Sequence, residues 1–147
     1  MIETSQVLRI SLDEAWKFLS DPSNLTTITP PSMGFKITSA VPPKIYPGLI
    51  LTYRITPLLG LPMTWVSEIT QVREPYFFVD RQLSGPYRYW DHEHELREVD
   101  GGVQMLDRVN FALPFWLAGT LMYHAVVKKQ LAEIFSYRRE VLERRFC

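Results

Sequence analysis

The chain of 147 residues has a single cysteine, Cys147, and no excess of charge of either sign. One cysteine excludes an intrachain disulfide framework and a cysteine metal cluster, and it fits a reducing compartment. Basic and acidic residues number 16 each, so the sequence lacks the positive charge that nucleic-acid binding requires. We therefore expect no disulfides and no nucleic-acid partner.

Long apolar runs are also missing. The longest, from Phe111 to Val127, contains Pro114 and His124 and is shorter than the ~20 residues of a membrane-spanning helix. The first ten residues do not show the basic, apolar and small-residue order of a secretory signal. These absences predict a cytoplasmic protein without a transmembrane segment.

Apolar and aromatic residues are plentiful, at 46% and 13% of the chain. This balance and length are typical of one globular domain, spanning residues 1–147, with a sizeable core. The aromatic content fits either the lining of a ligand pocket or the filling of a thick core.

The segment from residue 87 to 98 carries two histidines in an alternating pattern. Because alternate side chains of a strand share one face, one face would carry Arg88, Trp90, His92, His94 and Leu96. The opposite face, which includes Asp91, is mostly charged and belongs in water. The histidine face should point inward, where a cavity and its chemistry would lie.

A hairpin follows directly, because Asp100-Gly101 is a strong signal for a two-residue turn. Pairing Val99 with Gly102 places His94 opposite Asp107 and His92 opposite Val109. Asp107 is then the one charge in an apolar row. The functional interpretation is a His–Asp pair for acid–base chemistry or ligand orientation, and the alternative is a buried polar pair that satisfies itself.

The remaining segments predict one sheet and one long helix. A strand at 2–10 precedes two short helices, of which the first opens with the capping box Ser11–Glu14 and the second with Asp21-Pro22. A six-strand meander follows, with alternating segments at 33–41, 48–56, 63–74 and 76–83 before the hairpin. The final ~30 residues change to helical spacing. We expect an α+β fold in which a curved antiparallel sheet wraps a long helix and leaves a hollow between them.

Several motifs then carry a resemblance over nearly the whole chain. They are Ser20–Leu25, Ile28–Pro31, Asp80–Gln82, Gly85–Tyr87, Trp90, His92, His94, Gly101-Gly102, Met105, Asp107, Leu113-Pro114 and Phe135–Arg138. With them the sequence resembles the START-like, or SRPBCC, helix-grip superfamily, and its small bacterial ligand-binding members grouped with polyketide cyclase/dehydrase and lipid-transport proteins. The resemblance implies a seven-stranded helix-grip fold and an internal cavity.

The residues alone do not decide which face of the strand at 76–83 points inward. Either Phe78, Asp80 and Gln82 point inward, or the more apolar set of Phe77, Val79, Arg81 and Leu83 does. The resemblance favours Asp80 and Gln82, which would then join the two histidines and Asp107 in one polar cluster.

The candidate ligand-binding residues combine this polar cluster with aromatic side chains, an arginine at the rim and a helix histidine. They are Trp65, Asp80, Gln82, Arg88, Trp90, His92, His94, Asp107, Phe111, Trp116 and His124. Arg88 would bind a ligand carboxylate, or else be a solvated arginine at a strand end. Trp90 and His124 have packing as their alternative role, and Arg138, on the apolar helix stripe, would only extend its charge to the surface.

Three apolar connections, 57–62, 84–87 and 113–117, fall at one end of the predicted sheet. They indicate the lip of a cavity, a dimer contact or a surface that touches a membrane. Two histidines and Asp107 resemble a zinc ligand set, but no clear fourth ligand follows. We therefore expect no metal and no cofactor.

Three functional hypotheses follow. The first is a protein that binds a small hydrophobic or amphiphilic molecule in the cavity. The second is a cyclase, dehydratase or hydrolase in which His94 is the base, Asp107 orients it and His92 polarises a carbonyl. The third is an interaction module, such as a homodimer, that uses the apolar loop end.

Overall fold

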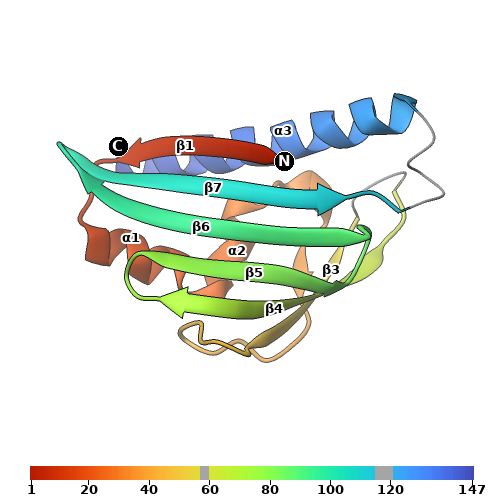
Figure 1. The fold of residues 1–147 in the computed structure, drawn as a ribbon, viewed down its shortest axis with the longest axis horizontal. Helices are drawn as coiled ribbons and strands as arrows, with labels where there is room; N and C mark the ends of the chain where they lie inside the picture. Colours follow the sequence, from red (N-terminus) through yellow and green to blue (C-terminus); the bar gives the residue numbers. More distant parts are fainter. Residues whose placement is uncertain (57–59, 115–120) are drawn as a thin grey trace.

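The computed structural model describes residues 1–56, 60–114 and 121–147, and for residues 121–124 it describes the backbone only. One curved antiparallel sheet has its strands in the order β1-β7-β6-β5-β4-β3-β2, and helix α3 runs along it beside β1 (Figure 1). The strands are β1 Ile2–Leu8, β2 Lys36–Ile37, β3 Ile50–Ile55, β4 Met63–Arg73, β5 Phe77–Ser84, β6 Tyr89–Val99 and β7 Gly102–Ala112. The helices are α1 Leu12–Leu19, α2 Leu25–Ile28 and α3 Leu121–Phe146, with 3₁₀ turns at Pro22–Asn24 and Pro31–Met33. The seven-stranded α+β fold is confirmed.

Helix α1 begins at the predicted capping box. The Ser11 hydroxyl accepts a hydrogen bond from the backbone N–H of Glu14, and the Glu14 carboxylate accepts one from the backbone N–H of Ser11. Asp21 caps the following 3₁₀ turn by accepting the N–H of Ser23 at 2.9 Å. The first turns of both short helices are therefore fixed locally, as the sequence predicts.

The hairpin between β6 and β7 has the predicted register. Val99 pairs with Gly102, and this pairing places His94 opposite Asp107 and His92 opposite Val109. Gly102 has a φ of 155°, and a Cβ atom there would lie 2.0 Å from the carbonyl oxygen of Leu8 in the neighbouring strand. The close approach of β1 therefore requires glycine at this position.

The strand predicted at 33–41 is wrong in length, because β2 contains only Lys36 and Ile37. Gly34 adopts a left-handed conformation with a φ of 55° directly before it. After it, the N–H groups of Thr38 and Ser39 both donate to the carbonyl of Thr52, which breaks the alternation of a regular ladder. The alternating apolar pattern thus continues beyond the backbone pairing.

Helix α3 buries one stripe of side chains along the sheet, as predicted, and is about 40 Å long at 1.5 Å per residue. Its buried side chains are Val127, Leu131, Phe135, Arg138 and Leu142. The helix is tied to strand β1 by two hydrogen bonds, from the Gln6 amide to the carbonyl of Arg139 and from the Arg139 guanidinium to the carbonyl of Ser5. These bonds hold the buried stripe over the sheet. No helix in the described part of the chain is both long and apolar enough to cross a membrane.

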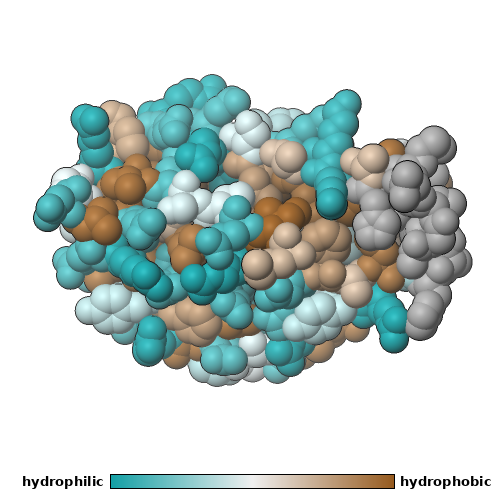
Figure 2. All heavy atoms as spheres, turned by 45° about the horizontal axis from the view of Figure 1, so that its top comes forward, coloured by the Kyte–Doolittle hydropathy of each residue, from teal (hydrophilic) through white to brown (hydrophobic). Residues whose placement is uncertain are grey.

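The core divides into two apolar clusters. The first cluster lies around α1 and includes Leu8, Trp16, Phe78 and Leu142. The second cluster lies around Trp65, with Trp90, Val109, Leu131 and Phe135 among its buried members. On the face turned forward in Figure 2, polar side chains cover much of the surface and apolar ones gather near its centre.

Candidate functional site

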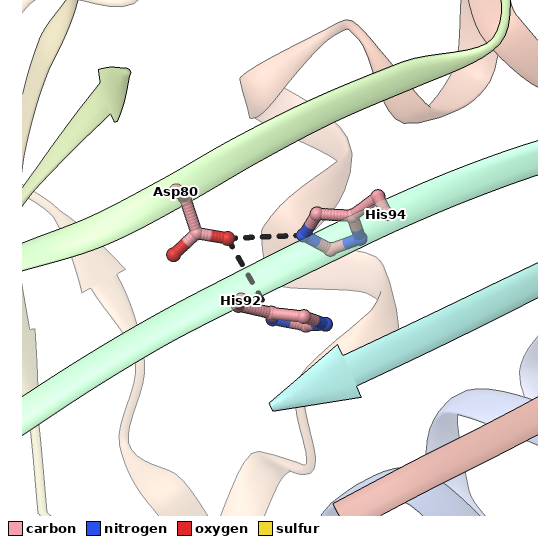
Figure 3. A group of neighbouring side chains, drawn as sticks. All are labelled: Asp80, His92 and His94. Carbon is pink, nitrogen blue, oxygen red and sulfur yellow. Dashed lines mark hydrogen bonds and ion pairs between the residues drawn. The ribbon is translucent and has the colours of Figure 1, made fainter. Parts of the chain in front are cut away.

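A cluster of buried charged and polar side chains lies between the two apolar clusters. Asp80 on β5 is paired with His92 on β6, and His94 on β6 is paired with Asp107 on β7. Figure 3 shows the Asp80 carboxylate directed at both imidazoles. The structure therefore resolves the open question about the strand at 76–83: Asp80 faces inward, as the resemblance implies. We call Asp80, His92, His94, Asp107 and Arg138 the ionic cluster.

Each imidazole in the ionic cluster lies between two carboxylates. His92 is hydrogen-bonded through Nε2 to Asp107 Oδ1 at 2.9 Å, and its Nδ1 lies 3.6 Å from Asp80 Oδ2. His94 is hydrogen-bonded through Nε2 to Asp80 Oδ2 at 3.0 Å. Its Nδ1 also approaches Asp107 Oδ1 to 2.9 Å, but this contact lacks the alignment of a hydrogen bond. All four imidazole nitrogens thus face a carboxylate oxygen.

Helix α3 supplies the fifth member, Arg138. One of its terminal nitrogens, Nη1, lies 3.3 Å from Asp107 Oδ1, and the whole side chain is buried. Asp107 is 1% exposed, so its charge is compensated by these neighbours rather than by water. The sequence places Arg138 on the apolar helix stripe but does not identify it as a site residue. Its position among apolar residues was the signal, because a cation on a buried face needs an anionic partner.

Burial opposes ionisation of both aspartates, but their neighbours outweigh it. The charge of Arg138, followed by the hydrogen bond from His92 and the close contact of His94, holds the pKa of Asp107 well below its usual range. The pKa of Asp80 is also lowered, against the effect of burial, by the hydrogen bond from His94 and the charge of His92. Both carboxyl groups are therefore ionised at neutral pH.

The pKa values of the two histidines shift in opposite directions. Burial and the neighbouring His94 lower the pKa of His92. Burial disfavours charge on His94 too, but its contacts with the Asp107 and Asp80 carboxylates outweigh this and raise the pKa of His94. His94 therefore has the higher proton affinity of the two histidines, and its imidazolium form together with Arg138 would balance the two carboxylates.

Two cavities meet at the ionic cluster. The larger, of about 150 Å³, lies in the second apolar cluster. The smaller, of about 60 Å³, lies in the first. Asp80, His94 and Arg138 border both of them. The ionic cluster is thus a polar wall between two apolar hollows.

Aromatic rings form much of the wall of the larger cavity. Trp65 packs edge-to-face against Trp90 at 5.2 Å between ring centroids and against Tyr87 at 5.7 Å. Trp65 and Arg138, which both line this cavity, each have a buried nitrogen with no hydrogen-bond partner within the described parts of the chain, Nε1 and Nε respectively. An apolar cavity bounded by unmatched donors suits a ligand that carries hydrogen-bond acceptors.

Five of the predicted ligand-binding residues meet at the larger cavity. They are Trp65, Asp80, Trp90, His92 and His94. Asp107 lies against the histidines on the side away from Asp80 and holds them in place. Lining residues that sequence reasoning missed are Phe35, Tyr87, Phe135 and Arg138. Tyr87, Phe135 and Arg138 lie within motifs that carry the resemblance, but sequence reasoning assigned none of these four residues a role in the site.

The other predicted site residues lie elsewhere. Gln82 stabilises the turn between β5 and β6 by exchanging two hydrogen bonds with the backbone of Tyr87. Phe111 packs against Tyr87 and Trp90 but does not line the cavity. Trp116 and the side chain of His124 lie outside the described residues.

Two expectations for the histidine strand are corrected. Arg88 does not share the inward face, because β6 begins at Tyr89 and Arg88 occupies the exposed bend before it. Asp91, expected in water, is buried on the opposite face, where it accepts two hydrogen bonds from Arg81 at 2.9 and 2.7 Å. Charge on a strand face therefore did not by itself indicate exposure.

Comparison with known proteins identifies the fold. No protein-family model and no curated protein matches the chain. A solved structure from Thermus thermophilus has 13% identity and a TM-score of 0.73, covering 98% of this chain and 94% of that one. Protein Ms6760 from Mycobacterium smegmatis has 21% identity and a TM-score of 0.67, with coverage of 96% and 87%.

A third similar structure is the di-domain ARO/CYC StfQ from the steffimycin biosynthetic pathway. It has 13% identity and a TM-score of 0.69, and the match covers 97% of this chain and 49% of that one. These likenesses agree with the sheet order and with the long helix after the last strand. The chain therefore has the helix-grip fold.

Proposed function

We propose that this protein binds a small, largely apolar molecule with hydrogen-bond acceptors in the larger cavity. The observation that carries the proposal is an aromatic wall whose lining residues Trp65 and Arg138 have buried nitrogens, Nε1 and Nε, with no hydrogen-bond partner among the described residues. Aromatic rings supply apolar contact area, and the donors orient an oxygen atom of the ligand. The fold likeness to an ARO/CYC is consistent with such a role.

The size of the cavity restricts the ligand. At about 150 Å³ it is smaller than the ~300–1,000 Å³ of pockets for drug-sized molecules. A compact ligand, such as one ring with a carbonyl or carboxylate group, suits this volume. Because burying an unmatched donor costs free energy, a ligand that supplies the acceptor gains more than an apolar molecule of the same shape.

Acid–base catalysis by His94, His92 and Asp107 stays a prediction. All four imidazole nitrogens face carboxylate oxygens in the structure, so each would have to exchange a partner before reaching a substrate. The interaction module and the homodimer also stay predictions. Residues 57–59 and 115–120 of the apolar loop end lie outside the described residues.

Trp65→Phe tests the proposed donor. Purified protein is screened against ring compounds with and without a carbonyl or carboxylate group, with intrinsic tryptophan fluorescence and native mass spectrometry as readouts. The variant keeps a ring and loses the N–H, so we expect acceptor-bearing compounds to bind about 5-fold more weakly, as the loss of one ~1 kcal/mol hydrogen bond predicts.

Trp16→Phe is the matched control. Its Nε1 is also buried and has no hydrogen-bond partner among the residues that the structure describes, but Trp16 lies in the first cluster and borders neither cavity. This variant should bind the same compounds as tightly as the unmodified protein. An equal loss in both variants, or no preference for acceptor-bearing compounds, would contradict the proposal.

A further inference from the structure

We propose that Asp80, His92 and His94 bind a divalent first-row transition metal ion, such as zinc, that faces the larger cavity. The sequence suggested the two histidines with Asp107 and no further ligand, which argued against a metal. The structure instead brings the carboxylate of Asp80 to the other side of both imidazoles. This inference goes beyond the proposed function and does not depend on it.

The three ligand atoms converge closely enough for one ion. Asp80 Oδ2 lies 3.0 Å from His94 Nε2 and 3.6 Å from His92 Nδ1, and all three atoms lie within 4.8 Å of one another. Ligand atoms ~2.1 Å from a common ion are about 3 to 3.4 Å apart in octahedral or tetrahedral geometry. An ion would replace the hydrogen bond between Asp80 and His94 and require small side-chain rotations.

Strand geometry brings these ligands together. His92 and His94 are alternate residues on one face of β6, and their ring centroids are 3.8 Å apart. Asp80 comes from the adjacent strand, paired directly with His92. Two rigid strands thus hold all three side chains, which favours a preformed site (Figure 3).

Asp107 and Ser67 support the ligands from outside. The nitrogens that face away from Asp80, Nε2 of His92 and Nδ1 of His94, both lie 2.9 Å from Asp107 Oδ1. Ser67 Oγ lies 3.3 Å from Asp80 Oδ1, the oxygen that does not contact His94. Metal-binding histidines typically direct their second nitrogen to a carboxylate in this way, which orients the ring and increases its basicity.

The charge of the site favours a cation. Metal-binding imidazoles are neutral, so the ionic cluster then contains two carboxylates and one guanidinium. Arg138 contacts Asp107 and does not occupy the position between Asp80 and the imidazoles. Once the proton on His94 is released, the two carboxylates and Arg138 leave one net negative charge, which a cation between Asp80 and the imidazoles offsets.

The same three residues line the larger cavity, so an ion would have coordination positions open to a ligand. Imidazole and carboxylate together suit first-row transition metals such as zinc or iron(II) better than magnesium or calcium, which prefer oxygen ligands alone.

The test is metal titration of the full chain after treatment with a chelator. Zn²⁺ binding is measured by calorimetry, and Co²⁺ binding by its visible absorption bands. We expect one ion per chain, with at least 100-fold weaker binding in His92→Ala and Asp80→Asn. Asp107→Asn keeps all three ligands and should weaken binding about 10- to 100-fold.

Glu93→Gln is the control, because Glu93 lies on the same strand with its carboxylate on the opposite face near Arg108. It should bind metal normally. Circular dichroism identifies variants that fail to fold, and Asp80→Asn preserves the side-chain shape if His92→Ala does not fold. Absence of saturable binding at millimolar metal, or equal binding by Asp80→Asn and the control, would overturn the proposal. Binding of ring compounds by the metal-free protein is measured separately and tests only the proposed function.

Discussion

The two halves of the core differ in how completely they are filled. The first cluster, beside α1, consists mainly of aliphatic side chains and encloses about 60 Å³. The second cluster is built around Trp65 and Trp90 and encloses about 150 Å³. Rigid rings that meet edge-to-face fill space less adaptably than branched aliphatic chains, so the aromatic half keeps the larger hollow. The ionic cluster separates the two.

The largest effect should come from removing the carboxylate between the halves. Asp107→Ala leaves Arg138 and both histidines without their shared anion, so we expect a loss of about 3–5 kcal/mol in the free energy of unfolding. Urea denaturation measures this loss. Glu3→Ala, which removes a partly exposed ion pair with Arg108, should cost less than about 1 kcal/mol. Equal losses in the two variants would show that the cluster does not hold the halves together.

Shortening a side chain to alanine should reduce stability more in the first cluster than in the wall of the larger cavity. Leu142 is fully buried, so Leu142→Ala should cost about 2–5 kcal/mol. Ile134 is only partly buried and borders the larger cavity, so Ile134→Ala should cost less, about 1 kcal/mol. Denaturation midpoints compare the two variants. A larger loss at Ile134 would reverse the proposed difference in packing.

Acidification should lower the free energy of unfolding by less than Asp107→Ala does, because it removes the charge of Asp107 but leaves its side chain in place. The pKa of Asp107 is lower in the folded protein than in the unfolded chain. Its stabilisation is therefore fully present above the unfolded pKa of about 4 and is lost as pH falls through the folded pKa. Denaturation of metal-free protein between neutral pH and pH 2 should show this loss, and Asp107→Asn should show less of it. An identical pH dependence would exclude Asp107 as its source.

Filling the larger cavity should have the smallest effect on the stability of the protein, but it should block the binding of ring compounds. Ile134→Phe adds ring volume beside Trp65 and Phe135, and we expect a change of less than about 1.5 kcal/mol in stability. Binding of the ring compounds should fall below detection by tryptophan fluorescence. Retained affinity in a folded Ile134→Phe variant would place the ligand outside this cavity.

Local chemistry explains the predictions that the structure confirms. The capping box at Ser11, the turn at Asp100-Gly101 and the apolar stripe of α3 depend on residues a few positions apart. The hairpin turn alone fixes the register, and with it the pairing of His94 with Asp107. Neighbours in sequence therefore determined three of the five members of the ionic cluster, His92, His94 and Asp107.

The register of β5 required more than its own sequence. Its pairing with β4 shifts between Ile69 and Gln71, so an alternation pattern read on one strand does not transfer to the next. Asp80 was ambiguous because the alternative face of this strand, with Phe77, Val79 and Leu83, is more apolar, so burial alone favoured the wrong face. Asp91 was misjudged because its partner Arg81 lies on that neighbouring strand.

The sequence by itself determined the order of strands and helices, the hairpin register and the inward position of the two histidines, because these follow from short-range periodicity and turn chemistry. Only the tertiary structure decided that Asp80 and Arg138 complete the ionic cluster and that the cavity has two parts. Arg138 is 31 positions beyond Asp107, and their contact depends on how α3 docks across the sheet. Docking is set by the summed packing of many side chains, which no local pattern encodes.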